Sequence, residues 1–274
     1  MVKEFAYDQE EINNDDAYGS IASNLHTAMH EVIGHGSGAV SPKLKGKDPA
    51  DFLPGYYSTL EEARADLVAM WNVYDPKLVD VGIAKDTTEL RKIGETMFQQ
   101  SIRVAFTQLL RIGKKDQLEE DHMKDRALIA NYIMENSDAV KVIHQNGKTY
   151  YHIVDYEKAH EAAGKLLAEL MRIKAEGDLK AIKVLIDKYG LKVDPKLRDE
   201  VQSRLDAPSY TGIVMPKLEP VLDSHGNVSD VKATYPCDLA AQMLEYSAFT
   251  KSAKAAVSGW SIELKKNSAP AGGY

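Results

Sequence analysis

The sequence has little cysteine, no long apolar run and no excess of basic charge. Its one cysteine, Cys237, excludes an internal disulfide framework and fits a reducing compartment, so we expect a cytoplasmic protein. No apolar segment approaches the roughly 20 residues that span a bilayer. The 34 Lys and Arg residues against 41 Asp and Glu give a net charge of -7, which argues against binding nucleic acid by phosphate neutralisation. We therefore expect partners other than membranes and nucleic acids.

What the sequence does contain is helical periodicity, which predicts a mainly α fold with a small β-hairpin and minor β structure. Residues 1–17 read as a polar lead-in to a helix that begins near Tyr18 and ends at the glycines between 34 and 38. Ser58-Thr59-Leu60-Glu61 matches a capping box and should open a second helix, ending near Val73. The remaining expected elements are helices over 87–112, 116–136, 156–175, 178–189, 195–205 and 237–256, a hairpin over 139–155 around Asn146-Gly147, irregular or β structure over 207–236 and a flexible tail over 257–274. One helical domain should cover 18–256.

The first of these helices should carry Ile21, Leu25, Met29 and Ile33 on its buried side, and it contains the stretch HEVIGH. His30 and His35 are five residues apart, so on a regular α-helix they point about 140° away from each other. One extra residue accommodated as a π-type turn would bring both imidazoles onto one face, and such turns concentrate at functional sites. Gly34 would tolerate the distorted backbone. Without a third ligand, the two histidines could equally well be packing residues.

A third ligand is available in the second helix. Catalytic zinc usually takes three protein ligands, and Glu62 lies in the acidic stretch EEARAD. Glu61 and Asp66 are then candidates for the carboxylates that accept the second N–H of a ligand histidine. The alternative is a capping residue followed by a solvated acidic face, which does not account for the concentration of carboxylates.

The pair HEVIGH and EEARAD resembles the HExxGH and EExRA(E/D) motifs of the dipeptidyl peptidase III family of zinc exopeptidases. The resemblance continues through EEDHMKDR, NGKTY, DYEKAH, RIKAEGD and YGLKVDPKLRDEV, and so covers roughly 18–250. It implies a helical, zinc-bearing catalytic lobe in which His30, His35 and Glu62 bind one Zn²⁺. It also implies that Glu31 is the general base that activates the zinc-bound water, that Glu61 and Asp66 hold the ligand histidines, and that His122 helps to stabilise the transition state.

The resemblance implies a zinc-dependent peptidase that releases dipeptides from the N-terminus of short peptides. Members of the family are much longer and have two lobes, and their residues that bind the peptide amino terminus lie largely upstream of the matched part. Two alternatives remain open: a domain that retains zinc and binds peptides with little or no turnover, and a plain helical protein whose histidines are incidental.

Overall fold

The computed structural model describes residues 1–206, 216–234, 240, 243–245 and 247. Contacts within the chain separate two units, 1–208 and 209–274, and each is described by itself. The predicted limits of a single domain at residues 18 and 256 stay a prediction. The expected helix over 237–256 and the tail over 257–274 lie largely or wholly outside the described residues.

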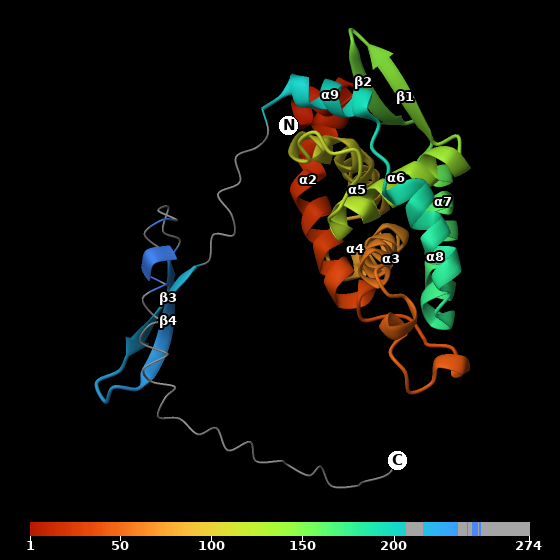
Figure 1. Ribbon diagram of the computed structural model, residues 1–274. Coiled ribbons are helices and arrows are strands. Elements are labelled where there is room, and N and C mark those ends of the chain that lie inside the picture. The colour runs from red at the N-terminus through yellow and green to blue at the C-terminus, as the bar shows by residue number, and fades with distance from the viewer. Residues whose placement is uncertain (207–215, 235–239, 241–242, 246, 248–274) are drawn as a thin grey trace. The chain divides into compact units, whose positions relative to one another are not determined.

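The first unit is built from α-helices, with one β-hairpin at one end of it, beside α9 (Figure 1). The predicted mainly α class is confirmed. The elements in chain order are α1 (Val2–Phe5), α2 (Gln9–Met29), a π-helical turn (His30–Gly34), 3₁₀ turns (Pro42–Leu44 and Pro49–Phe52), α3 (Tyr57–Asn72), α4 (Lys77–Asp80), α5 (Thr87–Thr107) with a 3₁₀ turn (Gln108–Arg111), α6 (Asp121–Asn136), β1 (Val140–Gln145), β2 (Lys148–Ile153), α7 (Tyr156–Glu176), α8 (Leu179–Leu185) with a second π-helical turn (Ile186–Gly190), and α9 (Pro195–Arg204).

Helix α3 lies at the centre of the first unit, packed against α2, α6 and α7. It contributes Leu67 and Met70 to a core that also contains Phe98 of α5, Leu128 of α6 and Leu166 of α7, all fully buried. The helix predicted over residues 87–112 is confirmed for most of its length, and its apolar residues face this core or the smaller cluster next to it. The central position of α3 fixes the acidic stretch 61–66 against three neighbouring helices.

Two helices begin at positions other than those predicted. Helix α2 begins at Gln9, because the Asp8 side chain accepts a hydrogen bond from the Glu11 amide and caps the helix. Residues 1–17 are therefore mostly helical rather than a lead-in. Helix α6 begins at Asp121 instead of 116, since the Leu118 amide donates to the Leu191 carbonyl in a short extended pairing.

The predicted capping box at Ser58 is wrong. Helix α3 already includes Tyr57, so Ser58 lies inside its first turn and no side chain caps this helix. The neighbouring Thr59 hydroxyl instead donates to Asp121 of α6 at 2.5 Å. Glu61 is correspondingly free to make other contacts.

The hairpin around Asn146-Gly147 is confirmed. Strands β1 and β2 pair antiparallel with Gln145 opposite Lys148, which leaves a two-residue turn. Both turn residues have positive φ, 53° at Asn146 and 73° at Gly147, as a type I′ turn requires.

In the second unit, β3 (Lys217–Leu222) and β4 (Val228–Thr234) form another antiparallel pair, in agreement with the irregular or β structure expected over 207–236. In the part of the chain that the structure describes, no helix combines the length and the apolar character that crossing a bilayer requires.

Candidate metal centre

A π-helical turn brings the two histidines of HEVIGH together. The His35 amide donates to the His30 carbonyl at 3.0 Å, a bond that spans five residues instead of four. The imidazole centroids lie 4.7 Å apart and the two Nε2 atoms 3.1 Å apart. The predicted departure from α geometry between His30 and His35 is therefore confirmed.

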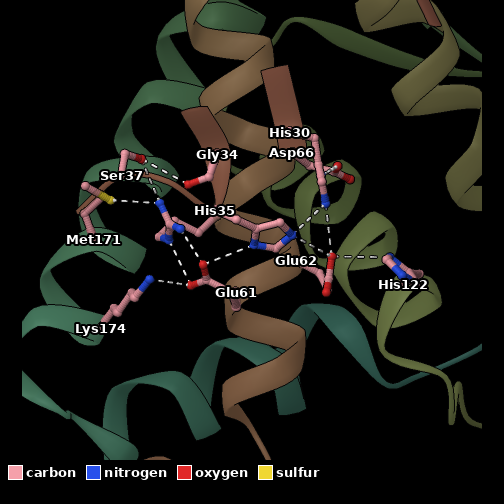
Figure 2. Close-up of polar contacts among 11 residues, drawn as sticks. His30, Gly34, His35, Ser37, Glu61, Glu62, Asp66, His122, Met171 and Lys174 are labelled. Atoms are coloured by element: carbon pink, nitrogen blue, oxygen red, sulfur yellow. Dashed lines mark hydrogen bonds and ion pairs between the residues drawn. The ribbon is translucent and has the colours of Figure 1, made fainter. Parts of the chain in front are cut away.

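Gly34 is required by close packing rather than by an unusual φ. A Cβ atom at this position would lie 2.9 Å from the Cα and Cβ atoms of Ala65 on α3. The glycine therefore lets the π-helical turn approach α3 closely (Figure 2). The same turn points two of its own residues outward: Val32 is 72% exposed and Ile33 is 40% exposed. The prediction that Ile33 is buried with Leu25 and Met29 is therefore wrong.

Helix α3 presents Glu62 to the two histidines. Glu62 Oε2 lies 3.2 Å from His30 Nε2 and 3.7 Å from His35 Nε2. This oxygen is buried, and it accepts no hydrogen bond from any described residue. The three side chains form a set whose ligand atoms all lie close enough to hold one metal ion. Ligands around a tetrahedral zinc ion are roughly 3.3 Å apart, because Zn–N and Zn–O distances are about 2.0–2.2 Å, and the spacings here are similar.

Two further carboxylates of α3 fix the orientation of the imidazoles. Asp66 Oδ1 lies 2.6 Å from His30 Nδ1, and Glu61 Oε1 lies 3.2 Å from His35 Nδ1. Burial opposes the charge of Asp66, but the hydrogen bond to His30 keeps the pKa of this carboxyl below its ordinary value. Each Nδ1 is thus occupied by a carboxylate, which directs each Nε2 toward Glu62.

Glu61 is in turn held by two cations. Arg64, which is fully buried, donates to both of its oxygens, at 2.5 and 3.0 Å, and Lys174 of α7 lies 2.8 Å from Oε2. Burial raises the pKa of Glu61, yet hydrogen bonds from Arg64 and Lys174 outweigh it and bring the pKa to about 2. Sequence reasoning missed both cations. The position of Arg64 three residues after Glu61 was an available signal, whereas nothing in the sequence connects Lys174 to α3.

The three atoms that face one another are suited to bind a cation. When both Nδ1 atoms donate to carboxylates, a neutral imidazole carries no proton on Nε2, so the two Nε2 lone pairs face each other at 3.1 Å. The buried Glu62 Oε2 beside them adds negative charge that has no hydrogen-bond donor among the described residues. A shared metal ion satisfies all three atoms at once, and two imidazoles with one carboxylate form a donor set that zinc accepts.

A cavity of about 330 Å³ opens beside this cluster, lined by residues of α2, α3, α5 and α6. His30, Glu31, Asp66 and His122 contribute to its wall. Glu31 is exposed, and His122 Nδ1 lies 3.6 Å from Glu62 Oε2 and 3.6 Å from Asp125 Oδ2. The Asp125 carboxylate, with a smaller contribution from Glu62, raises the pKa of His122 to about 9. Burial raises the pKa of Asp125 to about 7.

The structure thus brings together the side chains of all seven residues that the sequence proposed: His30, Glu31, His35, Glu61, Glu62, Asp66 and His122. His26 lies at the edge of the group, with Nε2 3.5 Å from Asp66 Oδ1, and burial lowers its pKa. His144, His152 and His160 contact Thr149, Glu11 and Trp71 instead.

Comparisons with known proteins point to a peptidase family. A family model described as peptidase family M49 matches residues 44–205, a segment that includes Glu61, Glu62, Asp66 and His122 but begins after His35. Nudix hydrolase 3 of Arabidopsis thaliana is 30% identical over 167 residues, which is 60% of this chain and 19% of that protein.

Two solved structures are similar to the chain. Dipeptidyl-peptidase III from Corallococcus sp. strain EGB has a TM-score of 0.50 and 29% identity, over 65% of this chain and 30% of that one. DPP III from Caldithrix abyssi has a TM-score of 0.49 and 26% identity, over 65% of this chain and 31% of that one. The chain therefore spans less than a third of the length of each of these three relatives.

Proposed function

Because this chain belongs to peptidase family M49, we propose that it is the zinc-bearing part of a peptidase that acts on short peptides and releases dipeptides from their N-termini. The similarity to the solved dipeptidyl-peptidase III from Corallococcus sp. strain EGB and the paired motifs HEVIGH and EEARAD support the dipeptidyl specificity. The observation that carries the proposal is the convergence of His30 Nε2, His35 Nε2 and Glu62 Oε2 beside a cavity.

In this proposal His30, His35 and Glu62 hold one Zn²⁺. Bound zinc supplies Lewis-acid chemistry: it lowers the pKa of a coordinated water toward neutrality and polarises the carbonyl of the scissile bond. The chain's contribution is to keep the three ligand atoms aligned. Asp66 and Glu61 do so by accepting the Nδ1–H bonds of the two histidines, so that neither imidazole can rotate away.

Glu31 is the proposed general base. It follows His30 directly, is exposed and lines the same cavity, so its carboxylate can reach a water molecule and a peptide next to the ligands. The Glu31 carboxylate accepts a proton from the attacking water, whose oxygen adds to the carbonyl carbon. When the C–N bond breaks, Glu31 returns this proton to the leaving amine nitrogen.

His122 is the proposed stabiliser of the transition state. A pKa of about 9 keeps its imidazole protonated at neutral pH, and the side chain lines the cavity. It lies on the side of Glu62 opposite His35 (Figure 2). A positive charge fixed at the cavity wall stabilises the negative charge that develops on the carbonyl oxygen.

The test measures zinc content and hydrolysis of a dipeptidyl arylamide on the same sample. We expect one tightly bound zinc per chain and measurable hydrolysis, and we expect Glu31→Ala to keep this zinc and lose the hydrolysis. The matched control is Asp16→Ala, which removes an exposed carboxylate from α2 and should change neither quantity. Bound zinc without hydrolysis in the unaltered chain would favour the peptide-binding alternative, and absence of zinc would contradict the proposal.

A further inference from the structure

Asp125 is a buried carboxylate that the proposed reaction does not use. It lies on α6, its exposed fraction is 0%, and neither of its oxygens accepts a hydrogen bond from any described residue. A buried carboxylate without hydrogen bonds is costly, since it loses the water that would solvate it. The closest cationic nitrogen is His122 Nδ1, which forms an ion pair with Asp125 Oδ2 at 3.6 Å, a distance too long for a hydrogen bond.

His122 faces two carboxylates at the same distance. Its Nδ1 atom lies 3.6 Å from Asp125 Oδ2 and 3.6 Å from Glu62 Oε2, and Glu62 Oε2 is likewise buried without a hydrogen-bond donor among the described residues. The ligand atoms of Glu62, His122 and Asp125 all lie within 4.8 Å of one another. The two 3.6 Å spacings from His122 are close to the roughly 3.3 Å between ligands of a tetrahedral zinc ion. One imidazole nitrogen and two carboxylate oxygens therefore surround a point at which positive charge is favoured.

The other charges around Asp125 do not supply a hydrogen bond or an ion pair to its carboxylate. Asp66 adds negative charge nearby, and Arg126 adds positive charge, but no hydrogen bond or ion pair joins either of them to Asp125 among the described contacts. Thr59 of α3 and Lys124 of α6 both donate hydrogen bonds to Asp121 and not to Asp125.

We propose that Glu62, His122 and Asp125 form a second divalent-cation site, adjacent to the zinc site and sharing Glu62 with it. The inference rests on the proposed function only through Glu62, since His122 and Asp125 take no part in holding the first zinc. Nitrogen and carboxylate ligands suit zinc, manganese and cobalt better than magnesium or calcium. The second cation binds less tightly than the first, because two like charges then flank one carboxylate.

The experiment is a zinc titration by equilibrium dialysis, with bound metal measured by atomic absorption on the intact chain. We expect two zinc ions per unaltered chain, the second at least tenfold weaker than the first. Asp125→Asn keeps the shape of the side chain and should bind one. His122→Ala, in which a half-exposed side chain is shortened, should also bind one and guards against misfolding of the Asp125 variant. Glu135→Gln, which removes an exposed carboxylate from the same helix, should bind two.

His35→Ala separates the two proposals. It breaks the first site and leaves Glu62, His122 and Asp125 complete, so it should bind one zinc with the weaker affinity. One zinc in the unaltered chain at saturating metal, lost in His35→Ala and retained in Asp125→Asn, overturns the second site and leaves the proposed function intact. No bound zinc in any variant overturns both. Two zinc ions in Asp125→Asn also overturn the second site.

Discussion

At the residue scale, the candidate metal centre consists of successive layers of hydrogen bonds. Glu62 and the two imidazoles face one another, Asp66 and Glu61 hold the outer nitrogens of the imidazoles, and Arg64 and Lys174 hold Glu61. A ligand that is pre-oriented loses less conformational entropy when a metal binds. The outer layers should therefore contribute measurably to metal affinity although they do not touch the metal.

Asp66→Asn tests the layer next to the ligands. The substitution keeps the size of the side chain but replaces the charged acceptor of the His30 Nδ1–H bond with a neutral amide. We expect zinc affinity to fall by about 10–100-fold, the usual effect of removing such a carboxylate, as measured by competition with a chelator of known affinity. Asp80→Asn on α4, where the carboxylate is exposed, should leave the affinity unchanged. An unchanged affinity in the Asp66 variant would show that His30 needs no anchor.

Lys174→Met tests the outermost layer. The change removes the contact from α7 to Glu61 while Arg64 still holds both oxygens of that carboxylate. We expect zinc affinity to fall by less than in Asp66→Asn, in the same chelator competition. A fall as large as that of Asp66→Asn would mean that α7, rather than Arg64, fixes Glu61. Lys165→Met, elsewhere on α7, is the matched control.

The sequence could predict the proposed ligands but not everything that holds them in place. The spacing of residues within each motif and the three-ligand rule indicated His30, His35 and Glu62, because spacing within a motif can be read directly from the sequence. Lys174 and Asp125 reach the centre from α7 and α6, and their contacts depend on how these helices pack against α3. No periodicity in a single sequence encodes that packing.

At the element scale, the π-helical turn does what a regular helix could not. It adds one residue between the histidines and still ends against α3, where Gly34 meets Ala65. The turn was predictable because two histidines five residues apart on a regular α-helix point in different directions and cannot bind the same metal ion. The start of α2 was missed for the opposite reason: Asn and Asp residues between 13 and 16 disfavour helices, and burial of the helix against α5 overrides that preference.

Gly34→Val tests the close approach of the turn to α3. The new Cβ would lie 2.9 Å from two atoms of Ala65, so either the turn or α3 must move. We expect a loss of about 1–3 kcal/mol in unfolding free energy, as for other overpacked sites, together with weaker zinc binding. Urea denaturation and a zinc titration measure the two effects. Val32→Ala, at a position that is 72% exposed, should change neither; a Gly34 variant as stable and as tight as Val32→Ala would contradict the packing argument.

At the scale of the whole first unit, the proposed zinc ligands join two segments that are separate in the sequence. His30 and His35 come from the turn after α2, and Glu62 comes from α3, which packs against α6 and α7. A metal that binds only when these parts are assembled stabilises the folded unit by mass action. Zinc should therefore act on the global stability of residues 1–208 and not only on the local order of the site.

Thermal unfolding with and without zinc tests this coupling. At free zinc about 1,000 times Kd the folded state should gain about 4.1 kcal/mol. In a domain of this size each kcal/mol raises Tm by about 2–4 °C, so the expected shift is roughly 8–16 °C. His30→Ala removes one ligand and should abolish most of the shift, whereas Asp16→Ala should preserve it. If zinc raised Tm equally in the His30 variant, the metal would be binding somewhere other than the HEVIGH turn. If Tm did not change in the unaltered chain although zinc was bound, the metal would bind the unfolded chain as tightly as the folded one, which three ligands from two packed helices should not allow.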